Sequence, residues 1–372
     1  MIDAQPTITL DPAGQALLKR HADWWQRKGM LVTRVQGTPL EPLWLPLADG
    51  TLAQDDVDLT PEMLDLDRLV DGMLTGVVQP TGVVASNVGR SGVPQATGSL
   101  ELNGDLFEVV APYTRVPWVE AILGNPVRAT IQGGSMRTST FVHQWSDWEQ
   151  RTVRRHEGWL DLLAHSTELL AARSGGRRAV VQTLMRGPSD LAEAVLGPEL
   201  MCLSLFEHQS ELRSFLEETT DTFIAILFEQ LRRIPQVAGG YVHPFGIWAP
   251  GTTVRTQCDA SVLLSPRHYG RWFLPYDTRI SEAVDTSIIH LHSCSLHVVD
   301  ELLKVERPQA IQVIIETGPN VPSIPDLVPI FRRILGVKPL VADGPMTEDE
   351  LHLLQDELPH SGLCIIARQA AW

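Results

Sequence analysis

Apolar residues recur in two patterns through the second half of the chain, and their alternation predicts a series of strands and helices. Short continuous apolar runs are typical of strands buried on both faces; they predict strands at 178–185, 239–247, 287–291, 310–316, 338–342 and 362–367. Apolar positions three and four residues apart predict helices at 157–172, 211–233, 266–284, 296–303, 326–335 and 347–357. Strands that alternate with helices form parallel sheets. The sequence therefore predicts an α/β fold, a (β/α)8 TIM barrel.

The first 150 residues are less regular. Helices are predicted at 13–29 and 60–73, whereas three prolines between Pro39 and Pro46 exclude a helix there. Residues 76–115 are rich in Gly, Val, Ser and Thr, which predicts irregular strands and loops. No internal repeat or long linker divides the chain. We therefore expect one barrel domain over 1–372, with an elaborated N-terminal region (1–150) followed by regular β/α units (151–372).

Composition narrows the class of protein. The 372 residues are 44% hydrophobic and carry a net charge of −15, which argues against a nucleic-acid surface. No apolar run has the length of a membrane span, and the first residues lack the features of a signal peptide. The four cysteines lie far apart, as free thiols or metal ligands would in a reducing compartment. We expect a soluble cytoplasmic protein that binds neither membranes nor nucleic acid.

The strongest candidate for chemistry is the end of the strand predicted at 287–291. His290 and His292 are two residues apart, so both side chains project from the same face of a strand. In parallel α/β folds, active sites lie at the carboxyl ends of the strands. The alternative is an ordinary strand end with hydrogen-bonded histidines.

Other predicted strand ends carry further ligand types. Glu316 ends one apolar strand and Cys364 lies in the last one. Imidazole, carboxylate and thiolate all bind zinc, and a tetrahedral site needs four ligands. His290, His292, Glu316 and Cys364 are thus the predicted metal ligands, although Glu316 alone could be a solvated residue and Cys364 a core residue.

Candidate catalytic and substrate-binding residues follow from the same placement. His290, Tyr241, His243 and Asp259 are the candidate catalytic residues, and Asp259 could instead be a structural acid. The candidate substrate-binding residues are Arg186, Trp248 and Asp343. Arg186 could pair with a substrate carboxylate or with a local acid. The Gly-Gly pairs lack phosphate-loop spacing, so no nucleotide site is inferred.

One segment resembles a known family. Asp259 is followed by an apolar run into Ser265-Pro266, then by an aromatic helix ending in Pro275-Tyr276, and His290 ends a strand soon afterwards. This order, together with a Gly-Pro turn after an apolar strand, resembles the uroporphyrinogen decarboxylase superfamily. The resemblance covers 178–372 and implies a β/α barrel.

The superfamily contains two chemistries. True uroporphyrinogen decarboxylases hold substrate carboxylates with arginines of an N-terminal segment, where this chain has Leu43 to Leu47 without arginine. A family tyrosine would fall near Ala194. Both departures, and the acidic net charge, argue against tetrapyrrole decarboxylation.

The other branch contains corrinoid-dependent and cobalamin-independent methyltransferases, which bind zinc through a His-x-Cys pair and a later Cys. His290, His292, Glu316 and Cys364 resemble that order, but His292 stands where a Cys would be, and Cys294 lies further along. The resemblance implies zinc, a small-molecule substrate and a corrinoid carried by a partner protein.

We therefore expect a zinc-dependent methyltransferase or demethylase component, with a homodimer as the expected assembly. The first alternative is a metal-free decarboxylase, a lyase that acts on a small acid or a tetrapyrrole-like substrate, with His290 as the proton donor. The second is a non-catalytic binding subunit that retains the barrel.

Overall fold

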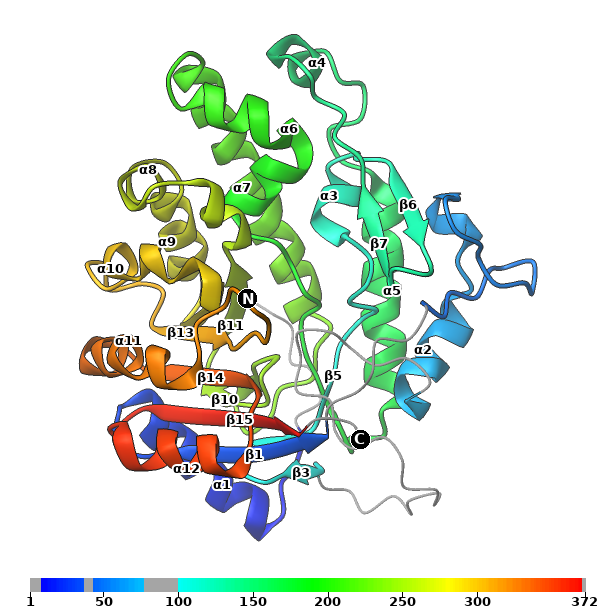
Figure 1. Cartoon of the computed structure of the whole chain (residues 1–372). Coiled ribbons are helices and arrows are strands. Elements are labelled where there is room, and N and C mark those ends of the chain that lie inside the picture. The colour runs from blue at the N-terminus through cyan, green and yellow to red at the C-terminus, as the bar shows by residue number, and fades with distance from the viewer. Residues whose placement is uncertain (1–7, 37–42, 77–99, 370–372) are drawn as a thin grey trace.

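The computed structural model describes residues 8–36, 43–76 and 100–369, and a six-stranded parallel sheet forms its centre (Figure 1). The strand order is β1-β15-β14-β13-β12-β11, and every neighbouring pair is parallel. The strands are β1 (Leu31–Gln36), β11 (Thr253–Gln257), β12 (Thr286–His292), β13 (Ala310–Ile314), β14 (Leu340–Pro345) and β15 (Leu363–Gln369). Four of them, β12 to β15, were predicted from their apolar runs, and the structure confirms them.

Helices of the C-terminal half lie along the outer side of this sheet (Figure 1). They are α7 (Gln209–Leu231), α8 (Pro266–Trp272), α9 (Leu274–Glu282), α10 (Val299–Leu302), α11 (Ile324–Val337) and α12 (Glu348–Glu357), with 3-10 turns η2 (Asp259–Leu263) and η3 (Ser293–Val298). Ser265 begins α8, since its side chain accepts a hydrogen bond from the His268 amide. Ser265 and Pro266, the Ser-Pro motif of the sequence analysis, therefore form the N-terminus of α8.

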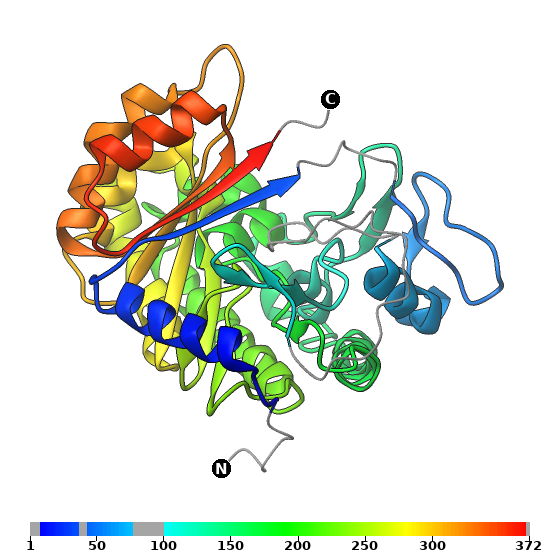
Figure 2. The same cartoon turned by 90° about the horizontal axis from the view of Figure 1, so that it is seen from below.

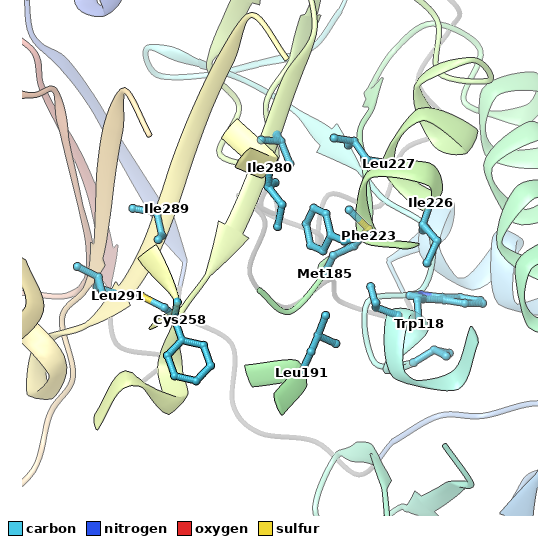
Figure 3. Packing of buried hydrophobic residues seen from close by; sticks show 14 of the residues in the cluster. Trp118, Met185, Leu191, Phe223, Ile226, Leu227, Cys258, Ile280, Ile289 and Leu291 are labelled. Carbon is cyan, nitrogen blue, oxygen red and sulfur yellow. The ribbon is translucent and has the colours of Figure 1, made fainter. Parts of the chain in front are cut away.

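The two faces of the sheet are buried in different cores. Ile289 and Leu291 of β12 face the helices, beside Cys258, in a large cluster that also contains Phe223 of α7 (Figure 3). Ile288, two residues before His290, belongs to a separate cluster inside the sheet. Because alternate residues of a strand point to opposite faces, His290 and His292 project to the same inner side as Ile288.

The N-terminal half combines short strands and helices with two 17-residue helices, α5 and α6. Its helices are α1 (Pro12–Trp25), η1 (Pro61–Met63), α2 (Leu66–Thr75), α3 (Trp118–Ile122), α4 (Trp145–Glu149), α5 (Glu157–Arg173) and α6 (Pro188–Ser204). Its strands are β2 (Asp58–Leu59), β3 (Leu102–Asn103), β4 (Leu106–Phe107), β5 (Val109–Val110), β6 (Val127–Thr130), β7 (Ser135–Thr138) and β8 (Ala179–Val180). Figure 2 shows β1 and β15 side by side, with α1 beneath the sheet and the short strands to one side.

Two predicted strands are shorter than expected, and neither belongs to the six-stranded sheet. Residues 239–247 do not join the central sheet, because β9 (Gly240–Val242) pairs antiparallel with β10 (Trp248–Pro250) as a hairpin. The strand that does join the sheet is β11, and the apolar segment after it is the turn η2. The predicted strand 178–185 is reduced to the two residues of β8.

The strand pairing of the described residues does not form a closed barrel. The six-stranded sheet has β1 and β11 at its edges, and β5 and β8 pair only with each other. A side chain bridges one gap, since Gln182 exchanges two hydrogen bonds with the main chain of Arg255 (2.9 and 3.1 Å). On the other side, the Asp105 amide donates to the Val32 carbonyl (3.2 Å). The confirmed architecture is α/β with a central parallel sheet.

None of the described helices combines the length and apolar character needed to cross a membrane. Parts of two sequence predictions, in the Pro39 to Pro46 segment and in 76–115, fall on 37–42 and 77–99 and lie outside the described residues.

Candidate metal centre

The carboxyl ends of the parallel strands open into one cavity of about 820 Å³. Polar side chains from five neighbouring strands line it: Gln257 of β11 and Asp259 just after it, His290 and His292 of β12, Gln312 of β13, Asp343 of β14 and Arg368 of β15. The cavity is also lined by Arg115, Glu120, Arg186 and Asp190, from the part of the chain that precedes the hairpin and the last five strands of the sheet. A polar cavity at this end of a parallel sheet is where α/β proteins bind their ligands.

Asp259, His290 and His292 converge within this cavity. One ligand atom from each residue lies within 4.8 Å of the others. His290 Nε2 lies 3.6 Å from Asp259 Oδ1, and His292 Nε2 lies 3.6 Å from Asp259 Oδ2. Both separations are too long for good hydrogen bonds. The two imidazoles and the carboxylate therefore face one another without being joined.

The far nitrogen of each imidazole is held by a neighbour on β13 or just beyond it. His290 Nδ1 makes a short hydrogen bond to Gln312 Oε1, and His292 Nδ1 lies 3.0 Å from Glu316 Oε1. A donor Nδ1–H leaves the lone pair on Nε2, which is the atom that faces Asp259. Hydrogen bonds of this kind orient histidines in metal sites.

These residues fit a divalent metal ion. Two ligands bonded to zinc at about 2.0–2.1 Å in a tetrahedron lie about 3.3 Å apart, close to the separations found here. Asp259 Oδ1 is buried and has no hydrogen-bond partner in the structure. A buried, unpaired carboxylate oxygen is costly unless a cation satisfies it. The donor set of two nitrogens and one oxygen suits zinc and other transition metals.

Charges in the cluster shift the proton affinities of the three residues in different directions. Burial lowers the pKa of His290 to about 3, and the Arg255 charge adds to this. Asp259 and then Glu316 raise the pKa of His292 to about 9. Burial alone would raise the pKa of Asp259, but the two histidines and Arg255 outweigh it and hold the pKa below its usual range. Metal binding at neutral pH must therefore displace the proton of His292.

A buried hydrogen-bond network holds Asp259 in place. Gln257 Nε2 donates to Asp259 Oδ2 (2.8 Å) and lies 3.0 Å from Asp190 Oδ2, and Arg255 donates to Gln257 Oε1 (2.8 Å). Asp190 also accepts from the Ala260 amide (2.9 Å). Burial, with the nearby Asp259 charge, raises the pKa of Asp190 to about 7. This network fixes the loop that carries Asp259.

Two predicted substrate-binding residues line the cavity, and each faces a residue of opposite charge. Asp343 is 2% exposed and accepts two hydrogen bonds from Arg368 (2.6 and 2.9 Å). Arg186 lies 3.1 Å from Glu120, which is itself buried.

Three other predicted site residues lie outside the cavity. Tyr241 is buried and donates to the Leu231 carbonyl. Both ring nitrogens of the fully buried His243 bond to main-chain groups, of Val254 and Phe245. Trp248 donates its indole N–H to the Val237 carbonyl. None of the three lines the cavity, because the segment folds as the β9–β10 hairpin instead of a barrel strand.

The predicted ligands Glu316 and Cys364 have different positions. Glu316 contacts His292 Nδ1 and is not one of the three converging residues. Cys364 is the second residue of β15, fully buried at the amino end of its strand in the inner core with Leu31 and Val341. Cys364 therefore lies at the opposite end of its strand from the cavity and apart from the three converging residues. Cys294 also lies outside the converging group.

Sequence reasoning missed most of the supporting residues. Arg255 and Gln257 alternate with apolar or small residues and lead to Asp259, a period of two that marks an inward-facing polar strand. Gln312 is the one polar residue of the otherwise apolar strand β13, which likewise indicates a side chain that faces the cavity. Arg115 lies in a loop, and no sequence pattern indicated that it would line the cavity.

Comparisons with known proteins find a similar fold but do not assign the chain to a family. No family model matches the chain, and no curated protein matches it. Among solved structures, the chain is similar to a methyltransferase from Methanosarcina mazei, with a TM-score of 0.50 and 12% identity, over 70% of this chain and 74% of the other. At this identity the likeness supports a shared α/β architecture.

Proposed function

We propose that this chain is a zinc-dependent methyl-transfer enzyme, with Asp259, His290 and His292 as the metal ligands. The observation that carries the proposal is the convergence of both Nε2 atoms on Asp259, while Gln312 and Glu316 hold both Nδ1 atoms. Three protein ligands leave a coordination position open, as catalytic zinc sites require. Zinc bound there would lower the pKa of a thiol or water and supply a nucleophile at neutral pH.

Methyl transfer is favoured over other metal-assisted reactions by two likenesses. The segment from Asp259 to Tyr276 resembles the uroporphyrinogen decarboxylase superfamily, whose zinc-binding members are methyltransferases. The overall fold is similar to that of a methyltransferase. We propose that the sheet belongs to a barrel of that superfamily, closed through β5 and β8, with the contacts at Gln182 and Asp105 in place of complete strand pairing.

In the proposed reaction, the acceptor loses its proton and gains the methyl group, and the donor keeps the electron pair of its bond to that methyl group. The chain's own residues prepare this step. Gln312 and Glu316 orient the two imidazoles, and the Gln257–Asp190 network fixes Asp259. The methyl donor that we propose is a corrinoid held by a partner protein.

The reaction can be tested with free methylcobalamin as donor and 2-mercaptoethanol as acceptor. Demethylation changes the visible spectrum of the corrinoid, and the methylated thioether can be measured by mass spectrometry. We expect zinc-loaded protein to accelerate transfer and His292→Ala to abolish that acceleration. Equal rates with His292→Ala, or with chelator-treated protein, would contradict the proposal.

The decarboxylase alternative has less support. With a pKa lowered by burial to about 3, His290 is a neutral imidazole at neutral pH, which disfavours its predicted role as proton donor. A non-catalytic binding subunit would retain ligands in the cavity yet fail the methyl-transfer assay.

A further inference from the structure

Four arginines line the cavity, and they differ in how their N–H groups are used. Arg368 donates two hydrogen bonds to Asp343, and Arg255 donates one to Gln257. Arg115 and Arg186 donate no side-chain hydrogen bond to any residue that the structure describes. Each guanidinium carries five N–H donors and no acceptor. Two cavity arginines therefore retain donors for a ligand.

The nearest acid only partly satisfies Arg186. Its Nη1 lies 3.1 Å from Glu120 Oε1, but that oxygen is buried and has no hydrogen-bond partner, so the contact is poorly aligned. Glu120 balances the charge of Arg186 at Nη1, and no hydrogen bond from the other N–H groups of Arg186 to a described residue is formed. The Arg186 side chain is 37% exposed, which keeps it accessible from the cavity.

Arg115 has no acid beside it among the described residues. It forms no ion pair there, and burial lowers its pKa, as expected for a cation that has lost water without gaining a carboxylate. Of the 45 acidic residues in the chain, only Asp3 and Glu41 lie outside the described residues. A cation held in this way at a cavity wall would be stabilised by an anionic ligand.

Three other acids of the cavity are already engaged. Asp343 is paired with Arg368, Asp259 faces the two histidines, and Asp190 accepts hydrogen bonds from Ala260 and Gln257. None of these three carboxylates forms an ion pair with Arg115 or Arg186. Glu193 also lines the cavity and is the remaining acid near this wall.

We infer that the substrate carries an oxyanion group, such as a carboxylate, sulfonate or phosphate, and that Arg115 and Arg186 bind it. Planar guanidinium groups match these anions with paired hydrogen bonds. The anion would be held in the same cavity as the Asp259–His290–His292 cluster, so the rest of the substrate could reach that cluster. This inference rests on the proposed function only in taking the cavity as the substrate site.

Binding of small oxyanions to chelator-treated protein tests the inference without the metal. The probes are succinate, ethanesulfonate and inorganic phosphate, with neutral succinamide as the matched control, titrated by ligand-observed NMR. We expect at least one oxyanion to bind and succinamide not to bind. The anion that binds best identifies the oxyanion class.

Arg115→Gln is the decisive variant, because removing Arg115 leaves no described partner unpaired. It should weaken binding of the oxyanion about 10- to 100-fold, the usual effect of losing charged hydrogen bonds. Arg115→Lys should restore part of the affinity. Arg154→Gln, outside the cavity and 65% exposed, is the matched control and should bind as the parent does.

Each other outcome overturns the inference: no oxyanion binds, succinamide binds equally well, or Arg115→Gln binds as tightly as the parent. Zinc content measured on the same variants separates the two claims. Arg115→Gln that retains zinc and loses anion affinity supports the anion site. A parent protein that binds the anion but no zinc would refute the metal proposal alone.

Discussion

Removing the carboxylate of Glu316 should weaken metal binding although Glu316 does not face the metal position. Its Oε1 lies 3.0 Å from His292 Nδ1, and Ser293 holds the same carboxylate, with its Oγ 3.4 Å from Oε2. Without Glu316, the His292 ring can rotate and its Nε2 basicity falls. Loss of such a hydrogen bond to a ligating histidine costs about 10- to 100-fold in metal affinity, or about 1.4–2.8 kcal/mol.

Zinc affinity of Glu316→Ala can be measured by competition with a chromophoric chelator. We expect one zinc per chain, bound about 10- to 100-fold more weakly than by the parent. Glu316→Gln should lose less, because its amide oxygen can still accept the proton of Nδ1. Circular dichroism and the melting temperature of the metal-free proteins verify that the fold is intact.

Glu282→Ala is the matched control, since Glu282 is an exposed glutamate at the end of α9. Its zinc affinity should equal that of the parent. If Glu316→Ala binds zinc as tightly as Glu282→Ala, the orienting role of Glu316 is refuted. If Glu316→Ala binds no zinc at all, Glu316 is itself a ligand and the assignment of three ligands is wrong.

Three further predictions concern the stability of the fold and the role of Cys364. Burial lowers the pKa of His21 to about 4, so its contribution to stability is present above pH 6.5 and is lost as the pH falls toward 4, by up to about 3 kcal/mol; urea unfolding of His21→Gln should show a weaker pH dependence, and an unchanged one would contradict this. Cys364→Ala should keep its full zinc content, which a loss of zinc on metal analysis would contradict. A Cβ on Gly187 would lie 2.2 Å from the Gln257 carbonyl oxygen, so Gly187→Ala should lower stability by about 1–3 kcal/mol; an unchanged melting temperature would show that this turn is not tightly packed.

The strands predicted correctly are those that contain short apolar runs. Strands β13 and β15 are nearly continuous apolar runs because both faces are covered, by the helices outside and the inner core within. Strand β11 escaped prediction because its inward positions, Arg255 and Gln257, are polar side chains of the cavity wall. Because these cavity residues are polar, β11 lacks the continuous apolar run from which β12 to β15 were predicted.

The candidate site was predictable where a local period determines the geometry. The spacing of His290 and His292 determined that both face one side of β12, and the structure brings them together with Asp259. Cys364 was misplaced because an apolar run does not reveal where its strand begins. His243 was misplaced because a hairpin and a parallel strand can have the same apolar pattern.

The most direct test of the account is X-ray diffraction from zinc-treated crystals, with data collected on both sides of the zinc absorption edge. We predict one anomalous peak per chain, at about 2.0–2.2 Å from His290 Nε2, His292 Nε2 and an Asp259 carboxylate oxygen. A peak bound by other residues, or no peak between these three side chains, would contradict the proposed metal centre.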